Sequence, residues 1–118
     1  MDQMPYKLDP RSRVAVLDAI REVCLHRNWT LLAAHVRSAH VHAVVEAEMQ
    51  PELIMNAFKS YASRSLNKLN ADKPHRNRWA RHGSTLWLWK DENARQAIQY
   101  VVEQQGESMA VFVAEEWR

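Results

Sequence analysis

Two histidines separated by one residue, His40 and His42, are the side chains in this sequence with the clearest capacity for chemistry. They lie in a segment, residues 37–45, whose second half alternates like a strand with one apolar face. Side chains at positions i and i+2 of a strand point to the same side, with Cα atoms roughly 6.6 Å apart. Two imidazoles at this spacing can share one metal ion. The structural alternative is a pair that only satisfies local hydrogen bonds on a sheet face.

Tyr100 and Gln104 are a second pair, one helical turn apart near the other end of the chain. Residues at i and i+4 project from one face of a helix, although a tyrosine and an amide so placed can also be a surface hydrogen-bonded pair. Two imidazoles and one amide oxygen would leave three octahedral positions for phosphate oxygens and water, as in an open catalytic site. Imidazole ligands favour Mn²⁺, whereas phosphate chemistry favours Mg²⁺.

The elements that must position these residues follow from the spacing of apolar side chains and from helix start and stop signals. The pattern predicts helices over residues 11–27, 51–69 and 91–105, and strands over residues 29–36, 40–47, 84–89 and 108–113. Residues 1–10 are expected to be irregular, with 6–8 as the tail of a short strand. This order favours an α+β fold with helices packed on one face of a sheet, resembling a ferredoxin-like antiparallel arrangement whose first strand is short or missing.

The bulk composition predicts one soluble domain over residues 1–118. No apolar run approaches the roughly 20 residues of a membrane span, and the start of the chain lacks the features of a secretory signal. The single cysteine, Cys24, excludes an internal disulfide and suits a reducing cytoplasm. We therefore expect a cytoplasmic protein with no membrane partner.

Positive charge gathers in the second half of the chain, although the net charge is only +2. Between residues 59 and 90, eight basic side chains stand against one acid, interleaved with tryptophans. Such a block suits a phosphate backbone and unstacked bases, although a solvated basic face is the alternative. The candidate DNA contacts are Lys59, Arg64, Arg76, Arg78, Arg81 and Trp79.

The motif segments resemble one known family. His40-Val41-His42 and the Ala43-Val44-Val45 that follows look like the histidine-hydrophobic-histidine (HUH) motif of single-tyrosine transposases of the insertion-sequence 200/605 type, including relatives associated with repetitive extragenic palindromes. Residues 97–104 resemble their catalytic helix. Residues 29–36, 55–67 and 78–85 resemble the flanking segments, so the likeness runs in order over residues 13–110.

The resemblance implies a single-strand DNA endonuclease and strand transferase. Tyr100 would be the nucleophile that forms a 5′-phosphotyrosine, and His40, His42 and Gln104 would hold Mg²⁺ or Mn²⁺, with Glu46 as an orienting residue. The ester retains the bond energy, so rejoining needs no ATP. The implied substrate is single-stranded or hairpin DNA of a mobile element, and the implied assembly is a homodimer with an active site that partners can share.

The sequence departs from the family pattern at two places and leaves other functions open. Ser38-Ala39 replaces the common Pro-Asn before the motif, and the first strand is short or missing; its absence would predict loss of activity.

The main alternative is a domesticated, non-cutting module that binds hairpin DNA. Another alternative is a different histidine-dependent phosphoesterase. Val44, however, stands where a histidine-triad hydrolase needs a third histidine, and the sequence does not fix which side of the sheet the His35 side chain faces. A non-enzymatic interaction protein is the residual reading.

Overall fold

A computed structural model of the chain describes residues 8–38, 40–69, 84–88, 94–103 and 109–115. The elements follow in the order α1 (Pro10–Arg27), β1 (Thr30–Val36), β2 (Val41–Glu46), α2 (Pro51–Leu69), β3 (Ser84–Leu88), α3 (Ala94–Glu103) and β4 (Ala110–Val113). Each of the three helices and four strands predicted after residue 10 is found within the described residues. The predicted α+β class is therefore confirmed.

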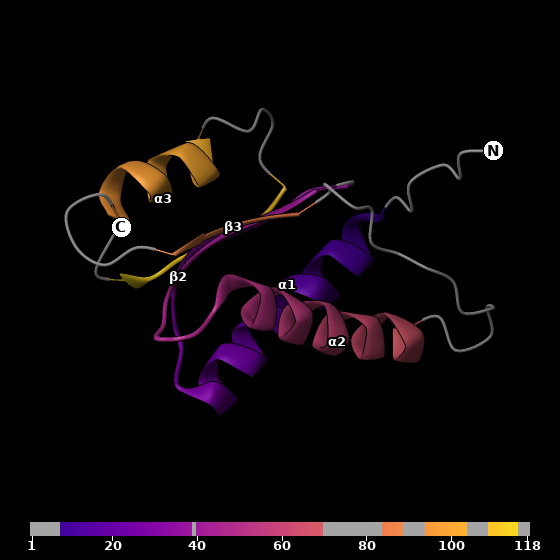
Figure 1. Cartoon of the computed structure of the whole chain (residues 1–118). Coiled ribbons are helices and arrows are strands. Elements are labelled where there is room, and N and C mark those ends of the chain that lie inside the picture. The colour runs from indigo at the N-terminus through magenta and orange to yellow at the C-terminus, as the bar shows by residue number, and fades with distance from the viewer. Residues whose placement is uncertain (1–7, 39, 70–83, 89–93, 104–108, 116–118) are drawn as a thin grey trace, which may run out of the picture.

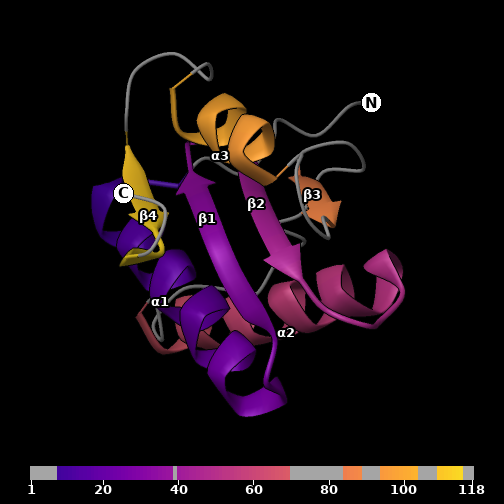
Figure 2. The same ribbon diagram turned by 90° about the vertical axis from the view of Figure 1, so that its left-hand side faces the viewer.

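The four described strands form one sheet in the order β3-β2-β1-β4. The central pair, β1 and β2, is antiparallel, and β4 adds antiparallel to the free edge of β1. Helices α1 and α2 lie together on one face, as expected, and α3 lies alone on the other (Figures 1 and 2). The motif strand β2 is thus paired on both edges and covered by helices on both faces.

Two details differ from the predicted arrangement. The strand β3 pairs parallel to β2, with Val41 opposite Ser84 and Val45 opposite Leu88, so the sheet is mixed rather than antiparallel. A helix, α2, connects these strands, and parallel neighbours require such a crossover. The second detail is α3, whose apolar stripe covers the face that α1 and α2 leave open. Two of the three residues predicted as the tail of a short first strand, 6 and 7, lie outside the described residues. The third, Leu8, is not part of a strand, and it donates its N–H to the Ser38 carbonyl at 2.7 Å.

The larger apolar core lies between the sheet and the helix pair α1 and α2. Asp9 caps α1, since its carboxylate accepts a hydrogen bond from the Ser12 N–H at 2.7 Å. Asn28 ends the helix in the left-handed conformation, with φ 58°. This core fixes the sheet and so supports the opposite face, where the histidine pair lies.

A smaller core joins α3 to the sheet. Its buried members are Leu32, Ala33, Val44, Ala97, Ile98 and Val101. Val44 follows His42 by two positions, so both side chains belong to the same face of β2. The helix that carries Tyr100 therefore covers the face that carries the histidine pair.

Candidate metal centre and nucleophile

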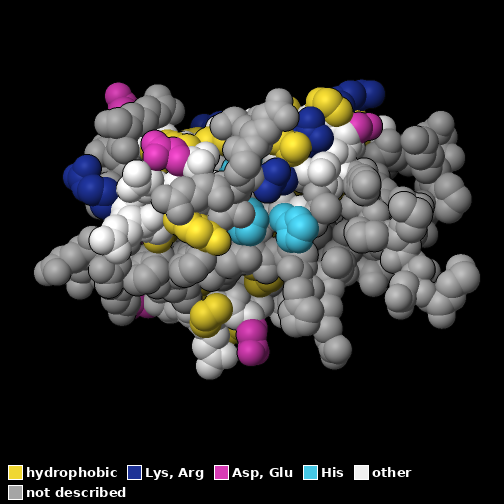
Figure 3. Space-filling view, turned by 90° about the horizontal axis from the view of Figure 1, so that it is seen from above, with side chains coloured by type: hydrophobic (Ala, Val, Ile, Leu, Met, Phe, Trp, Pro, Cys, Tyr) yellow, Lys and Arg dark blue, Asp and Glu magenta, His cyan; other side chains and the backbone are white. Residues whose placement is uncertain are grey.

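The rings of His40 and His42 lie side by side on the α3 face of the sheet. Their centroids are 6.1 Å apart and their planes differ by 11°. His42 lies in β2, whereas His40 precedes the strand, in a tight turn where its carbonyl accepts the Arg37 N–H at 2.8 Å. Figure 3, a view onto the α3 side, shows histidine side chains at the surface beside Lys and Arg side chains. The two imidazoles thus lie next to each other, although only His42 belongs to the strand.

His42 is the buried member of the pair, at 8 % exposure, whereas His40 is exposed. The pKa of His42 is lowered from 6.5 to about 4, chiefly by burial and to a smaller extent by the charges of His40, His35 and Arg37. The ring is therefore neutral at pH 7 and keeps one nitrogen lone pair for a ligand. Among the described residues its Nδ1 atom has no hydrogen-bond partner although it is buried, which is costly unless something binds there.

The spacing of these two rings would allow them to share a metal ion. A metal–imidazole bond is about 2.1 Å, so one ion reaches two rings whose centroids lie up to roughly 6.5 Å apart, and the pair is within that limit. The described part of the chain holds no cluster of three or more His, Cys, Asp or Glu side chains suited to a metal. Gln104, the predicted third ligand, lies outside the described residues.

Tyr100 lies near the end of α3, one residue before the buried Val101, and its side chain is 42 % exposed. Helix α3 packs on β1 and β2 through Ala97, Ile98 and Val101. The structure therefore brings the tyrosine helix and the histidine pair to the same face of the sheet. Accessibility at the surface is what a nucleophile that attacks a macromolecular substrate needs.

Two charged or polar neighbours of the pair were not predicted as site residues. His35 is the cross-strand partner of His42, and it is completely buried. Arg37 follows two positions later, opposite His40 in the turn, and its charge lowers the pKa of both His35 and His42. Its buried Nε atom has no partner among the described residues. In the sequence, His35 and Arg37 stand two positions apart, as residues on one face of a strand do. Which face of the sheet this is becomes known only from the register of the hairpin.

The predicted DNA contacts are only partly described. Lys59 and Arg64 lie on α2, on the opposite face of the sheet from α3. Arg64 stacks over the ring of Tyr61, with its guanidinium carbon 4.6 Å from the ring centroid. The remaining four candidates, Arg76, Arg78, Trp79 and Arg81, lie outside the described residues.

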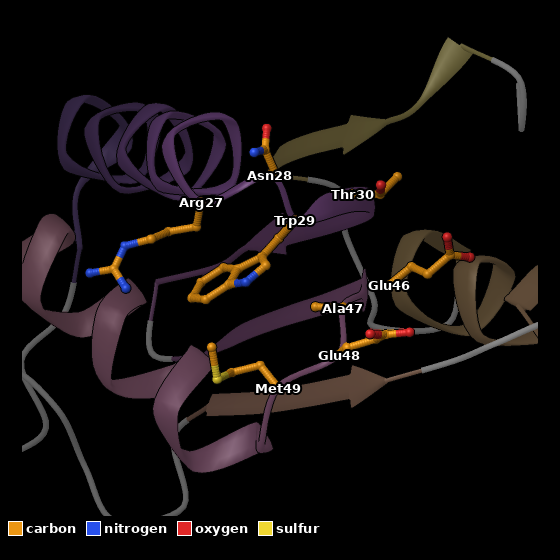
Figure 4. Close-up of a pocket in the computed structure, with 8 residues that line it drawn as sticks. All are labelled: Arg27, Asn28, Trp29, Thr30, Glu46, Ala47, Glu48 and Met49. Carbon is orange, nitrogen blue, oxygen red and sulfur yellow. The ribbon is translucent and has the colours of Figure 1, made fainter.

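A hollow of about 670 Å³ opens at the far end of β2 from His40 (Figure 4). Trp29, Met49, Glu46 and Glu48 are among the residues that line it. Glu46, the predicted orienting residue, is exposed and pairs in register with Thr30 at this end of the hairpin. The structure thus places Glu46 at the hollow rather than beside the two histidines.

Comparison with known proteins identifies the class to which this fold and site belong. The sequence model of the family described as "Transposase IS200 like" matches residues 8–108. The match covers most of the chain and includes both histidines, Tyr100 and Gln104. The chain therefore belongs to the IS200-like transposase family, a family of DNA-processing proteins of mobile elements. The chain matches no curated protein and no solved structure.

Family membership identifies one partner of the chain. A transposase binds DNA, so DNA is a partner of this chain. None of the described helices is both long and apolar enough to pass through a lipid bilayer.

Proposed function

We propose that this transposase nicks and rejoins single-stranded DNA through a covalent bond to Tyr100, at a metal site built on His40 and His42. The observation that carries the proposal is the shared face. Within a chain matched by the family over residues 8–108, the histidine pair and the tyrosine helix lie on the same side of the sheet. A homodimer and a hairpin substrate belong to the same proposal, because the resemblance implies both.

Tyr100 would act as the nucleophile. Its hydroxyl oxygen attacks the phosphorus of one phosphodiester, the new O–P bond forms a 5′-phosphotyrosine, and the bond from phosphorus to the 3′-oxygen breaks. The tyrosine proton passes to water, and the departing 3′-oxygen takes a proton to become a hydroxyl. One phosphoester replaces another, so the reverse reaction with a new 3′-hydroxyl rejoins the strand without ATP.

His40, His42 and Gln104 would hold Mg²⁺ or Mn²⁺. When bound, the ion supplies Lewis-acid polarisation of the scissile phosphate, which compensates for a nucleophile whose free pKa is about 10. The low pKa of His42 keeps its ring in the neutral form that ligates metals. Its unpartnered Nδ1 atom supports this assignment, because a buried polar nitrogen needs a partner.

Arg37 would bind a phosphate oxygen of the DNA beside the histidine pair. The guanidinium fork matches phosphate geometry, and its Nε atom is buried without a protein partner in the described residues. This assigns the anion-binding role on the α3 face to a residue in the turn before β2. Lys59 and Arg64, on the other face, would then contact DNA strands away from the scissile phosphate.

The test is covalent capture of labelled DNA. Purified protein is incubated with 5′- and 3′-labelled hairpin-bearing single-stranded DNA from its own genomic flanks, with Mn²⁺, Mg²⁺ or a chelator. Tyr100→Phe is compared with Tyr61→Phe, a matched change on α2 at the opposite face. We expect a metal-dependent adduct from wild type and Tyr61→Phe and none from Tyr100→Phe. Specific hairpin binding without an adduct from wild type would instead identify a non-cutting DNA-binding module.

A further inference from the structure

His35 connects three elements of the α3 face through both nitrogens of one buried ring. Its Nδ1 atom lies 3.1 Å from the carbonyl oxygen of Val101, in the last turn of α3. Its Nε2 atom accepts the Met109 N–H at 3.0 Å, at the residue that precedes β4. The ring itself belongs to β1 and is completely buried. One side chain therefore ties the end of α3 and the start of β4 to the centre of the sheet.

The two hydrogen bonds fix the tautomer of this ring. A backbone N–H can only donate, so Nε2 must present its lone pair to Met109. A carbonyl oxygen can only accept, so Nδ1 must carry the hydrogen that it donates to Val101. His35 is therefore neutral with Nδ1 protonated, and neither nitrogen has a lone pair left for a metal ion. This separates its role from that of its cross-strand neighbour His42, whose Nδ1 has no partner in the described structure.

The Val101 carbonyl receives this bond near the end of the described part of α3. Val101 stands two residues before Glu103, the last residue of α3 that the structure describes. His35 satisfies this carbonyl from outside the helix, one residue after Tyr100. The contact of α3 with the sheet is otherwise formed by alanine, valine, leucine and isoleucine side chains. Such apolar contacts do not fix the position of the helix along its axis as a directed hydrogen bond does.

We propose that His35 is a positioning residue for the cleavage reaction: it clamps the Tyr100 helix to the strand pair that carries His42. The catalytic consequence rests on the proposed function, whereas the clamp itself does not. Misplacement of a reacting group by about 1 Å can cost roughly 100-fold in rate, so a loosened α3 should slow the attack by Tyr100 while leaving DNA binding largely unchanged.

The experiment compares His35→Phe, which removes both hydrogen bonds and keeps an aromatic ring, with His26→Phe as the matched control. His26 is exposed, lies on α1 and contacts Tyr61, on the opposite side of the molecule. His35→Gln retains an amide group within reach of the Met109 N–H, and His35→Asn retains one for the Val101 carbonyl. Two quantities are measured in the full-length protein: amide exchange at Met109 without DNA or metal, and the rate of adduct formation with saturating hairpin DNA and Mn²⁺.

We expect His35→Phe to lose protection at Met109 and to form the adduct roughly tenfold more slowly, as the loss of about one or two net hydrogen bonds would produce. Its affinity for the hairpin should stay within about twofold of wild type, and His35→Gln and His35→Asn should recover part of the rate. An adduct rate for His35→Phe equal to that of His26→Phe would overturn the proposal. Should His35→Phe fail to fold, wild-type rates in both amide variants would overturn it equally.

The two readouts separate this inference from the proposed function. If wild type forms no adduct at all, the cleavage proposal fails, and unchanged protection of Met109 in His35→Phe would show that the clamp fails as well. If wild type forms the adduct but the His35 variants match it, cleavage stands and only the positioning role is lost.

Discussion

The low pKa of His42 predicts that acid destabilises the metal-free protein through this one ring. The unfolded chain binds a proton at His42 below its ordinary pKa of 6.5, whereas the folded protein binds it only below about 4. Between these values the unfolded state holds more protons, so the free energy of unfolding falls as the pH falls. Each pKa unit corresponds to about 1.4 kcal/mol, so the loss from His42 between pH 7 and pH 5 is roughly 2 kcal/mol.

The assay is urea unfolding followed by tryptophan fluorescence, in the presence of a chelator, at pH 7 and pH 5. Wild type should lose roughly 2 kcal/mol more than His42→Gln over this interval. Burial also lowers the pKa of His35, so His42→Gln should keep a residual acid sensitivity. His26→Gln, an exposed change on α1, should match wild type. Equal losses in wild type and His42→Gln would refute the account of His42 as a ring that stays neutral in the fold.

Three further predictions follow from other parts of the structure. Arg37→Gln should slow adduct formation by about one order of magnitude and Arg37→Lys by less, because Lys restores the charge but not the fork; equal rates for the two variants would contradict phosphate binding by the guanidinium. Cys24, whose pKa burial raises to about 12, should resist a thiol reagent at pH 8 until urea unfolds the protein, and rapid native labelling would place it at the surface. Asp9→Ala should lower the free energy of unfolding by about 1 kcal/mol through the lost cap of α1, whereas Asp18→Ala, on the exposed face of the same helix, should change it little.

The sequence predicts the elements well because their signals are local. The apolar spacing of residues 11–27 and the start at Pro51 reproduce α1 (Pro10–Arg27) and α2 (Pro51–Leu69) nearly to the residue. The i, i+2 spacing of His40 and His42 is also a local signal, and the two rings lie nearly parallel in the structure although His40 precedes β2.

The features that the sequence leaves open depend on how distant elements meet. No local sequence pattern predicts that α3 covers the face of the sheet opposite α1 and α2. No local pattern predicts that β3 pairs parallel to β2 either. The direction of His35 follows from the register of the hairpin, in which His35 faces His42 and a bulge interrupts the pairing between Leu31 and Ala33. The roles of His35 and Arg37 are therefore visible only once the strands are paired.

The most direct test of the central claim is to identify the residue that becomes bonded to DNA. Each of the three tyrosines falls in a different tryptic peptide, since Arg95 precedes Tyr100, Lys59 and Arg64 flank Tyr61, and Lys7 follows Tyr6. After nuclease and trypsin treatment of the adduct, mass spectrometry should find the phosphonucleotide on the peptide that begins at Gln96. A phosphonucleotide on either of the other tyrosine peptides, or no adduct with any metal, would contradict the account.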